Sequence, residues 1–130
     1  MDKNKILLID DDPSISDLYK ERLEMDGFEV TIAVNGSEAI EFLSDKKFDL
    51  ILLDIMMPSI GGLDVLDVIK SKEQYRDTPV IMLTALIDEE PHKKSLIKGA
   101  SDYIIKTKTT PKELVERIKN ILSKNNPPAK

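Results

Sequence analysis

The 130-residue sequence contains no cysteine and no tryptophan, and only 5% of its residues are aromatic. Without cysteine, disulfide bonds, thiolate metal sites and a cysteine nucleophile are excluded. No apolar run approaches the roughly 20 residues that a membrane-spanning helix needs. The apolar run at residues 6–9 ends at three aspartates and so lacks the form of a signal peptide. We therefore expect a cytoplasmic protein that does not contact a membrane.

What the sequence does contain is typical of one globular domain. Hydrophobic residues make up 41% of the chain and charged residues 33%, and the length is enough for a sizeable core. The last residues, Asn-Asn-Pro-Pro-Ala-Lys, include no core-forming side chain. We expect a domain over residues 1–124, followed at 125–130 by a disordered tail or the start of a linker.

The net charge of −5 is unevenly distributed. Residues 1–90 hold 9 Lys/Arg against 21 Asp/Glu, whereas residues 91–130 hold 10 against 3. The acidic total argues against direct nucleic-acid binding, which usually needs a basic domain. Two interpretations of the basic last third stay open: solvated helix faces, or a positive surface for an acidic partner.

Short apolar runs alternate along the chain with segments of helical period. The runs lie at residues 6–9, 28–34, 50–53, 80–83 and 103–105. They mostly lack polar alternation, which is typical of strands buried on both faces of a parallel sheet. Five such strand–helix units predict an α/β fold, a doubly wound five-stranded parallel sheet of flavodoxin-like order 2-1-3-4-5 with helices on both faces.

The predicted helices have recognisable starts. Asp12 before Pro13 is a typical N-cap, and Ile15, Leu18 and Leu23 follow at helical spacing. Asn35 with Glu38 predicts the cap of a second helix, and a third is expected after Gly61-Gly62. A fourth is expected at about residues 89–98. Thr110 with Glu113 has the form of a capping box for the last helix.

Polar side chains stand where four of the five predicted strands end, which is the edge where open α/β sheets bind ligands. They are Asp10 and Asp11, Asp54, Thr84 and Lys106. Several carboxylates meeting at one crevice repel each other, and an all-oxygen acidic site suits Mg²⁺. A lysine and a hydroxyl opposite them could bind phosphoryl oxygens. The constellation favours phosphoryl transfer to a carboxylate.

The segments ILLIDDDP, DLILLDIMMPSIGGLDVL, PVIMLTA and GASDYIIK resemble the signature segments of bacterial response-regulator receiver domains, including chemotaxis regulators. The resemblance covers residues 4–124 in the right order. It implies a phosphoacceptor switch of a two-component system or phosphorelay, dependent on Mg²⁺. The implied partners are a sensor histidine kinase or phosphotransfer protein, and a downstream protein or an output domain absent from this chain.

The resemblance also implies a role for each site residue. Asp54 would be the phosphoacceptor, Asp10 and Asp11 the acidic metal-binding pair, and Lys106 a phosphoryl-binding lysine. With Asp54, the backbone carbonyl of Met56 would complete the metal ligands. The implied switch residues are Thr84, Ala85 and Tyr103. Output would pass through the surface of the helix at 89–98, the strand at 103–105 and the last helix.

The sequence departs from the family pattern at three positions. Thr107 follows Lys106 where a proline with a cis bond is usual, and such a bond before threonine would cost about 3 kcal/mol. Gly61 stands where an aspartate is common, which predicts a looser start of the third helix. Met56 is large and apolar at a position that affects phosphoryl loss. None of these changes removes a reacting group.

Three alternatives fit the sequence less well. A flavin-binding module would need a Ser/Thr/Gly-rich loop after the first strand, where three aspartates stand instead. A phosphatase with an aspartyl intermediate would need a second acid/base aspartate two residues beyond Asp54, and Met56 occupies that position. A degenerate receiver acting only as a scaffold conflicts with the complete set of reacting groups.

Overall fold

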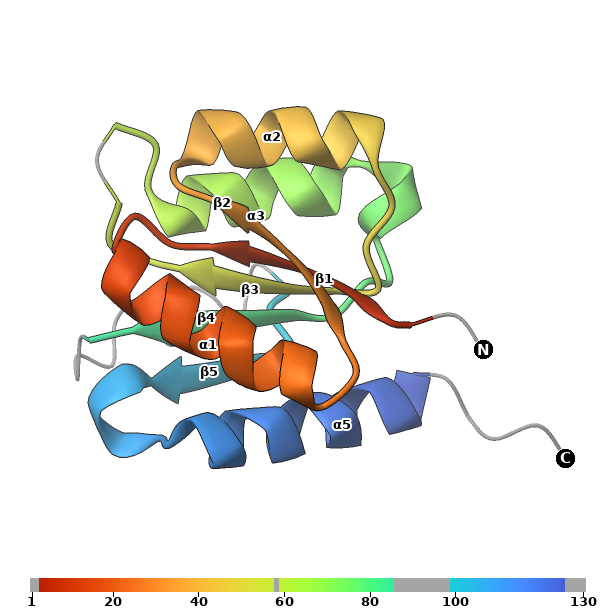
Figure 1. The fold of residues 1–130 in the computed structure, drawn as a ribbon. Helices are drawn as coiled ribbons and strands as arrows, with labels where there is room; N and C mark the ends of the chain where they lie inside the picture. Colours follow the sequence, from red (N-terminus) through yellow and green to blue (C-terminus); the bar gives the residue numbers. More distant parts are fainter. Residues whose placement is uncertain (1–2, 58, 86–98, 126–130) are drawn as a thin grey trace, which may run out of the picture.

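The computed structural model of the chain describes residues 3–57, 59–85 and 99–125. Its strands are β1 (Lys5–Ile9), β2 (Glu29–Ala33), β3 (Leu50–Asp54), β4 (Val80–Thr84) and β5 (Asp102–Ile105). All are parallel, in the order β2-β1-β3-β4-β5 (Figure 1). The predicted fold class and strand order are confirmed.

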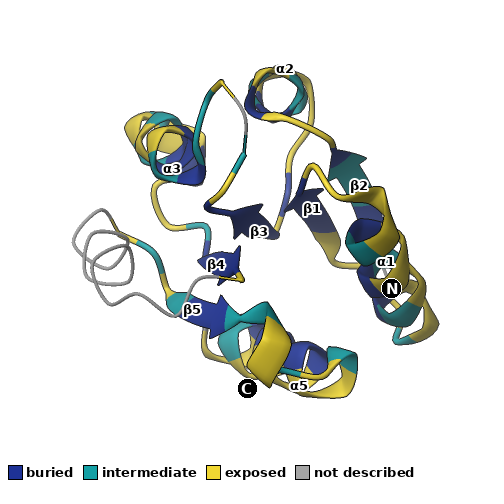
Figure 2. Ribbon diagram, turned by 90° about the vertical axis from the view of Figure 1, so that its left-hand side faces the viewer, coloured by how far each residue is buried: buried dark blue, intermediate teal, exposed yellow. Residues whose placement is uncertain are grey.

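Among the residues that the structure describes, helices lie on both faces of the sheet (Figure 2). One face packs against α2 (Gly36–Asp45) and α3 (Gly62–Ser71), and the other against α1 (Pro13–Met25) and α5 (Pro111–Asn125). Two short 3₁₀ helices, η1 (Glu73–Tyr75) and η2 (Lys106–Lys108), were not predicted. The helix expected at 89–98 lies outside the described residues, as do residues 126–130.

Alternate residues of each strand supply the two core layers. In β3, Ile51 and Leu53 face the α2–α3 layer, whereas Leu50 and Leu52 face the α1–α5 layer. All four are fully buried. The near-continuous apolar strands therefore follow from burial on both faces, as expected of a parallel sheet.

The predicted starts of α1, α2 and α5 are confirmed, and α3 begins at Gly62. The Asp12 carboxylate accepts from the Ser14 amide at 3.1 Å and caps α1. Asn35 caps α2, and Thr110 and Glu113 bond reciprocally at the start of α5. Gly61 precedes α3 without a side-chain cap, so this start relies on backbone contacts alone.

One apolar position of α1 differs from the prediction. Ser16, Tyr19 and Leu23 face the core, whereas Leu18 is 54% exposed and Ile15 only partly buried. A small serine allows close packing, and a tyrosine buries its ring. Ile15 packs against this core layer and Leu23 is fully buried, as predicted, so hydrophobicity misplaced only Leu18 in this helix.

Candidate functional site

The carboxyl ends of β1 and β3 bring three aspartates together. One carboxylate oxygen from each of Asp10, Asp11 and Asp54 lies within 4.8 Å of the others. Asp10 and Asp54 are buried, and Asp11 is exposed. Because β1 and β3 are hydrogen-bonded neighbours, their adjacent ends place the carboxylates at one edge of the sheet. The cluster can hold a metal ion, since it presents oxygen ligands from three side chains.

Lys106 reaches the same cluster from the end of β5. Its Nζ lies 2.6 Å from Asp10 Oδ2 and 3.4 Å from Asp54 Oδ2, and its side chain is only 9% exposed. The bond between Lys106 and Thr107 is trans, since the described residues include no cis peptide bond. The departure from the family pattern at Thr107 therefore leaves the lysine at the carboxylates.

Burial raises the pKa of the Asp54 carboxyl from its ordinary value of 3.8 to about 6, against the lowering effect of Lys106 and with a further rise from Asp10. Burial also lowers the pKa of the Lys106 ammonium, but its hydrogen bond to Asp10 and the nearby aspartates leave that pKa above its ordinary value. One cation thus faces three carboxyl groups. Full ionisation leaves the cluster with a formal charge of −2, which a hard divalent cation would neutralise.

Backbone amides orient the two buried carboxylates. The Met56 amide donates to Asp54 Oδ1 at 3.2 Å, and the Asp12 amide donates to Asp10 Oδ1 at 3.0 Å. These two donors were not predicted from the sequence. Each lies two residues beyond the aspartate that it holds, so a tight turn after each strand supplies the contact.

The remaining predicted residues lie on neighbouring strands. Asp54 is in register with Leu83, so the fully buried Thr84 ends β4 one position further along. Ala85 follows it and is exposed. Tyr103 is buried in β5. The Met56 side chain is 61% exposed and lies beside the cluster rather than in the core.

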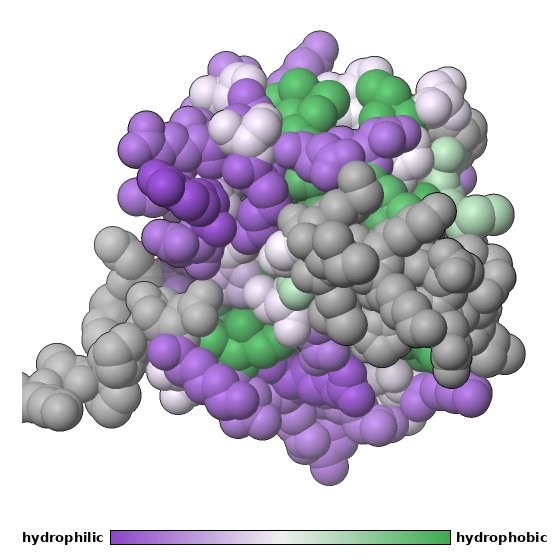
Figure 3. Space-filling model, turned by 180° about the vertical axis from the view of Figure 1, so that it is seen from behind, coloured by the Kyte–Doolittle hydropathy of each residue, from purple (hydrophilic) through white to green (hydrophobic). Residues whose placement is uncertain are grey.

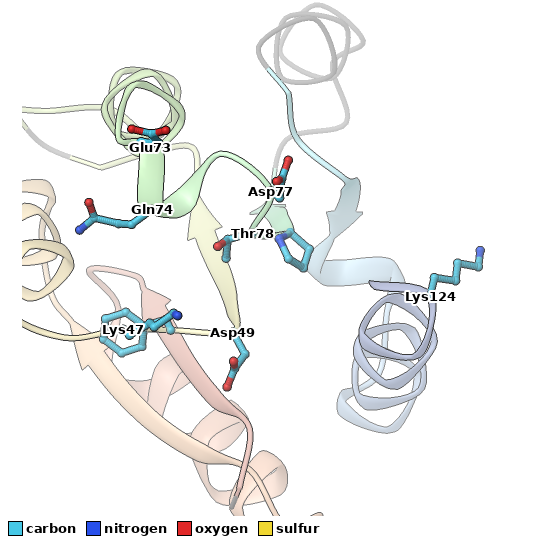
Figure 4. A pocket seen from close by; sticks show the side chains of 9 residues that line it. Lys47, Asp49, Glu73, Gln74, Asp77, Thr78 and Lys124 are labelled. Carbon is cyan, nitrogen blue, oxygen red and sulfur yellow. The ribbon is translucent and has the colours of Figure 1, made fainter. Parts of the chain in front are cut away.

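A polar hollow lies at the other end of the strands from the acidic cluster, where β3 and β4 begin (Figure 4). It has a volume of about 580 Å³, and Asp49, Glu73, Asp77 and Lys124 are among its lining residues. Their side chains point in different directions and do not converge on one point. Seen from behind, the described surface is mainly hydrophilic, with small separate apolar areas (Figure 3). Neither this hollow nor the surface seen from behind gathers charged groups as closely as the acidic cluster does.

Comparison with known proteins places this chain in a family. The response regulator receiver domain family matches residues 6–119, and the chain belongs to it. Receiver domains are the phosphoacceptor switches of two-component signalling, so the class predicted from the sequence is confirmed.

Individual relatives support the assignment. The transcriptional regulatory protein CpxR of Escherichia coli (strain K12) is 47% identical over 122 residues, which cover 94% of this chain and 50% of CpxR. The chain spans about half the length of the curated relatives it matches.

Solved structures agree with the fold. A CheY-like receiver domain from Methanospirillum hungatei JF-1 has a TM-score of 0.90 at 33% identity, covering 95% of this chain and 97% of that one. The BeF3-activated receiver domain of Klebsiella pneumoniae RstA has a TM-score of 0.84 at 35% identity, covering 92% and 98%. No helix among the described residues is long and apolar enough to cross a membrane.

Proposed function

We propose that Asp54 is the residue of this receiver domain that accepts the phosphoryl group. The supporting observation is the acidic cluster itself: Asp54 lies beside Asp10 and Asp11, within 3.4 Å of the Lys106 ammonium. Its Oδ1 is held by the Met56 amide. A carboxylate fixed in this way presents its second oxygen to an incoming phosphorus atom.

In the proposed reaction, an Asp54 carboxylate oxygen attacks the phosphorus of the donor. A new P–O bond forms while the bond between phosphorus and the leaving group breaks, and the leaving group takes that electron pair. Lys106 turns from the carboxylates toward a phosphoryl oxygen and offsets its charge. The Thr84 hydroxyl donates to another phosphoryl oxygen. The chain thus supplies positioning and charge compensation, which are the main requirements of phosphoryl transfer.

Mg²⁺ is the cation that this oxygen-rich cluster fits best. Asp10, Asp11 and Asp54, with the backbone carbonyl of Met56, would hold it. When bound, it would neutralise the carboxylates and the transferred phosphoryl oxygens. Three carboxyl groups facing one lysine support this assignment, because the protein alone does not balance their charge.

Switching is proposed to begin at Thr84 and Ala85 and to pass to Tyr103, which would change its side-chain position. The output surface would include β5 and α5. Exposed cations there are Lys108, in η2 between the two elements, and Lys112, Arg117 and Lys119 on α5. Lys93, Lys94 and Lys98, in the helix expected at 89–98, lie outside the described residues. The excess of cations favours an acidic partner. Shifted β5 and α5 amide resonances on adding beryllofluoride would support this coupling, and unchanged ones would refute it.

The proposed partners are a sensor histidine kinase or phosphotransfer protein as donor, and a downstream protein or an output domain as recipient. The matched relatives are transcriptional regulators about twice as long as this chain, which supports an output domain in a longer protein. We further propose a cytoplasmic location, a domain boundary near residue 124, and no turnover substrate beyond the chain's own phosphorylation and dephosphorylation.

Intact-mass measurement after incubation with acetyl phosphate tests the proposal. We expect one added phosphoryl group that requires Mg²⁺ and is absent from the Asp54→Asn variant. Addition to Asp54→Asn would place the acceptor elsewhere. If the folded wild type gains no mass and also fails to bind beryllofluoride, the alternative of a scaffold without phosphorylation is favoured instead.

A further inference from the structure

Gly36, the first residue of α2, is buried against the turn that joins β3 to α3. A Cβ atom built on Gly36 would lie 2.8 Å from Cβ of Ile60, and 3.1 Å from Cγ2 of both Ile60 and Val65. The first distance is shorter than real Cβ contacts. Gly36 does not have a positive φ, so its backbone is open to any residue. Close approach to Ile60, rather than backbone freedom, therefore requires glycine here.

The start of α2 is held in place and cannot easily move away from Ile60. Asn35 Oδ1 accepts from the Glu38 amide at 2.8 Å, and Glu38 Oε1 accepts from the Val34 amide at 3.2 Å. The two bonds tie Glu38, in the first turn, to the cap residue and to the residue before it, and so fix where the helix begins. A side chain added at Gly36 would therefore displace Ile60 rather than the helix.

The turn that carries Ile60 is closed at its base, beside Asp54. The Gly62 amide donates to the Ile55 carbonyl at 2.9 Å. A Cβ atom on Gly62 would lie 2.1 Å from the Asp54 carbonyl oxygen, so α3 begins directly against the end of β3. The same turn includes Met56, whose amide holds Asp54 Oδ1. A shift of Ile60 therefore reaches the hydrogen bond that orients the carboxylate through Gly62, because the Ile55 carbonyl and the Met56 amide belong to the same peptide group.

The turn also has space to move into. A hollow of about 320 Å³ lies beside it, and Asp11, Asn35, Ser37, Ser59 and Ile60 are among its lining residues. Ser59 is in the left-handed region, with φ of 67°, a conformation that is unfavourable for serine. A strained turn next to open space depends on its remaining packing contacts, of which Ile60 on Gly36 is one.

We propose that Gly36 is a positioning residue for phosphorylation, which acts by seating Ile60 and so holding the Met56 amide against Asp54. The inference rests on the proposed role of Asp54 and adds a distant residue to the same site. Gly36 touches no reacting atom. It contributes by having no side chain where the start of α2 contacts the turn that joins β3 to α3.

The test compares Gly36→Ala with Gly61→Ala in the same chain. A Cβ on Gly61 would meet only the Ile55 carbonyl oxygen, at 3.8 Å, so Gly61→Ala is a matched control in the same turn. Initial rates are measured by intact mass at saturating Mg²⁺ over a range of acetyl phosphate concentrations. We expect Gly36→Ala to lower the maximal rate about tenfold or more, with an unchanged half-saturating concentration, and Gly61→Ala to match the wild type.

Ile60→Gly provides the rescue arm, because it removes both Ile60 atoms that an alanine at position 36 would strike and leaves only Val65 Cγ2, at 3.1 Å. We expect Ile60→Gly to react slowly, and the double variant with Gly36→Ala to be no slower. Full additivity of the two losses would overturn the proposal. So would a wild-type rate in folded Gly36→Ala. If Gly36→Ala does not fold, Ile60→Gly alone decides: slow labelling supports the proposal and wild-type labelling overturns it.

The Met56 amide resonance separates this inference from the proposed function. It reports the hydrogen bond to Asp54 in the metal-free protein, without any phosphorylation. We expect this resonance to move in Gly36→Ala and to stay in place in Gly61→Ala. If it does so while the wild type accepts no phosphoryl group, the proposed function fails but the contact path stands. An unchanged Met56 resonance in Gly36→Ala overturns the path itself.

Discussion

Replacing Asp54 with asparagine should stabilise the metal-free protein at neutral pH but not in acid. The pKa of the Asp54 carboxyl is 3.8 ordinarily and about 6 in the fold, mainly because the group is buried. A carboxyl with a higher pKa in the folded state binds protons more strongly there than in the unfolded chain. Stability therefore falls as pH rises from about 4 to about 6.

The size of this effect follows from the same two values. A difference of about two pH units corresponds to about 3 kcal/mol of unfolding free energy. Above about pH 7 the full loss of unfolding free energy is present, because Asp54 is then ionised in both the folded and the unfolded state. Below about pH 4 it vanishes, because the carboxyl is protonated in both. Asparagine has a similar shape and can still accept from the Met56 amide, but it has no charge to bury.

Urea unfolding with a chelator present measures the difference. We expect Asp54→Asn to exceed the wild type by about 3 kcal/mol at about pH 7.5 and to match it near pH 4. Asp17→Asn is the control, since Asp17 is exposed on α1 and its substitution removes no buried charge. A difference between Asp54→Asn and wild type that stays constant across this range would refute the assignment of a raised pKa to Asp54.

Two further predictions concern the buried ion pair and α1. Lys106→Met should destabilise the metal-free protein by about 3 kcal/mol at neutral pH, because it leaves two buried carboxylates uncompensated. In urea unfolding, the same substitution should cost less stability when Asp10 has already been replaced by asparagine. An equal loss in the two backgrounds would contradict the pairing of Lys106 with Asp10. Leu23→Ala should lower the free energy of unfolding by about 2 to 5 kcal/mol, because Leu23 is fully buried. Leu18→Ala should lower it by less than about 0.5 kcal/mol. Equal losses of stability in thermal unfolding would contradict this assignment of the buried side of α1.

Features encoded locally were predictable from the sequence. The strands of the sheet are apolar because both faces are buried, and the caps at Asp12, Asn35 and Thr110 use side chains within three residues of their targets. The cluster of acidic residues at the carboxyl ends of the strands was also predictable, because parallel strands place the residues that follow them at the same side of the sheet. These predictions needed only periodicity, cap chemistry and the direction of the strands.

Contacts between distant segments were not predictable in the same way. The bond of Lys106 to Asp10 joins residues 96 positions apart. The place of Lys106 at the end of a strand indicated a role for the lysine, but not which carboxylate it would contact. The contact of Gly36 with Ile60 gives no periodic signal at all. In α1, the choice of Ser16 and Tyr19 over Leu18 depends on the shape of the neighbouring layer, which hydrophobicity does not encode.

The energetics of the acidic edge connect stability to the proposed function. Burying Asp54 beside Asp10 destabilises the metal-free fold at neutral pH, and Lys106 offsets only part of that cost. Any ligand that supplies positive charge to the folded state alone would recover stability in proportion to its occupancy. In the proposed reaction a phosphoryl group on Asp54 would reverse the balance again, since it adds negative charge and would draw Lys106 away from the carboxylates. A site left short of positive charge would therefore respond strongly to both the cation and the phosphoryl group, as a switch requires.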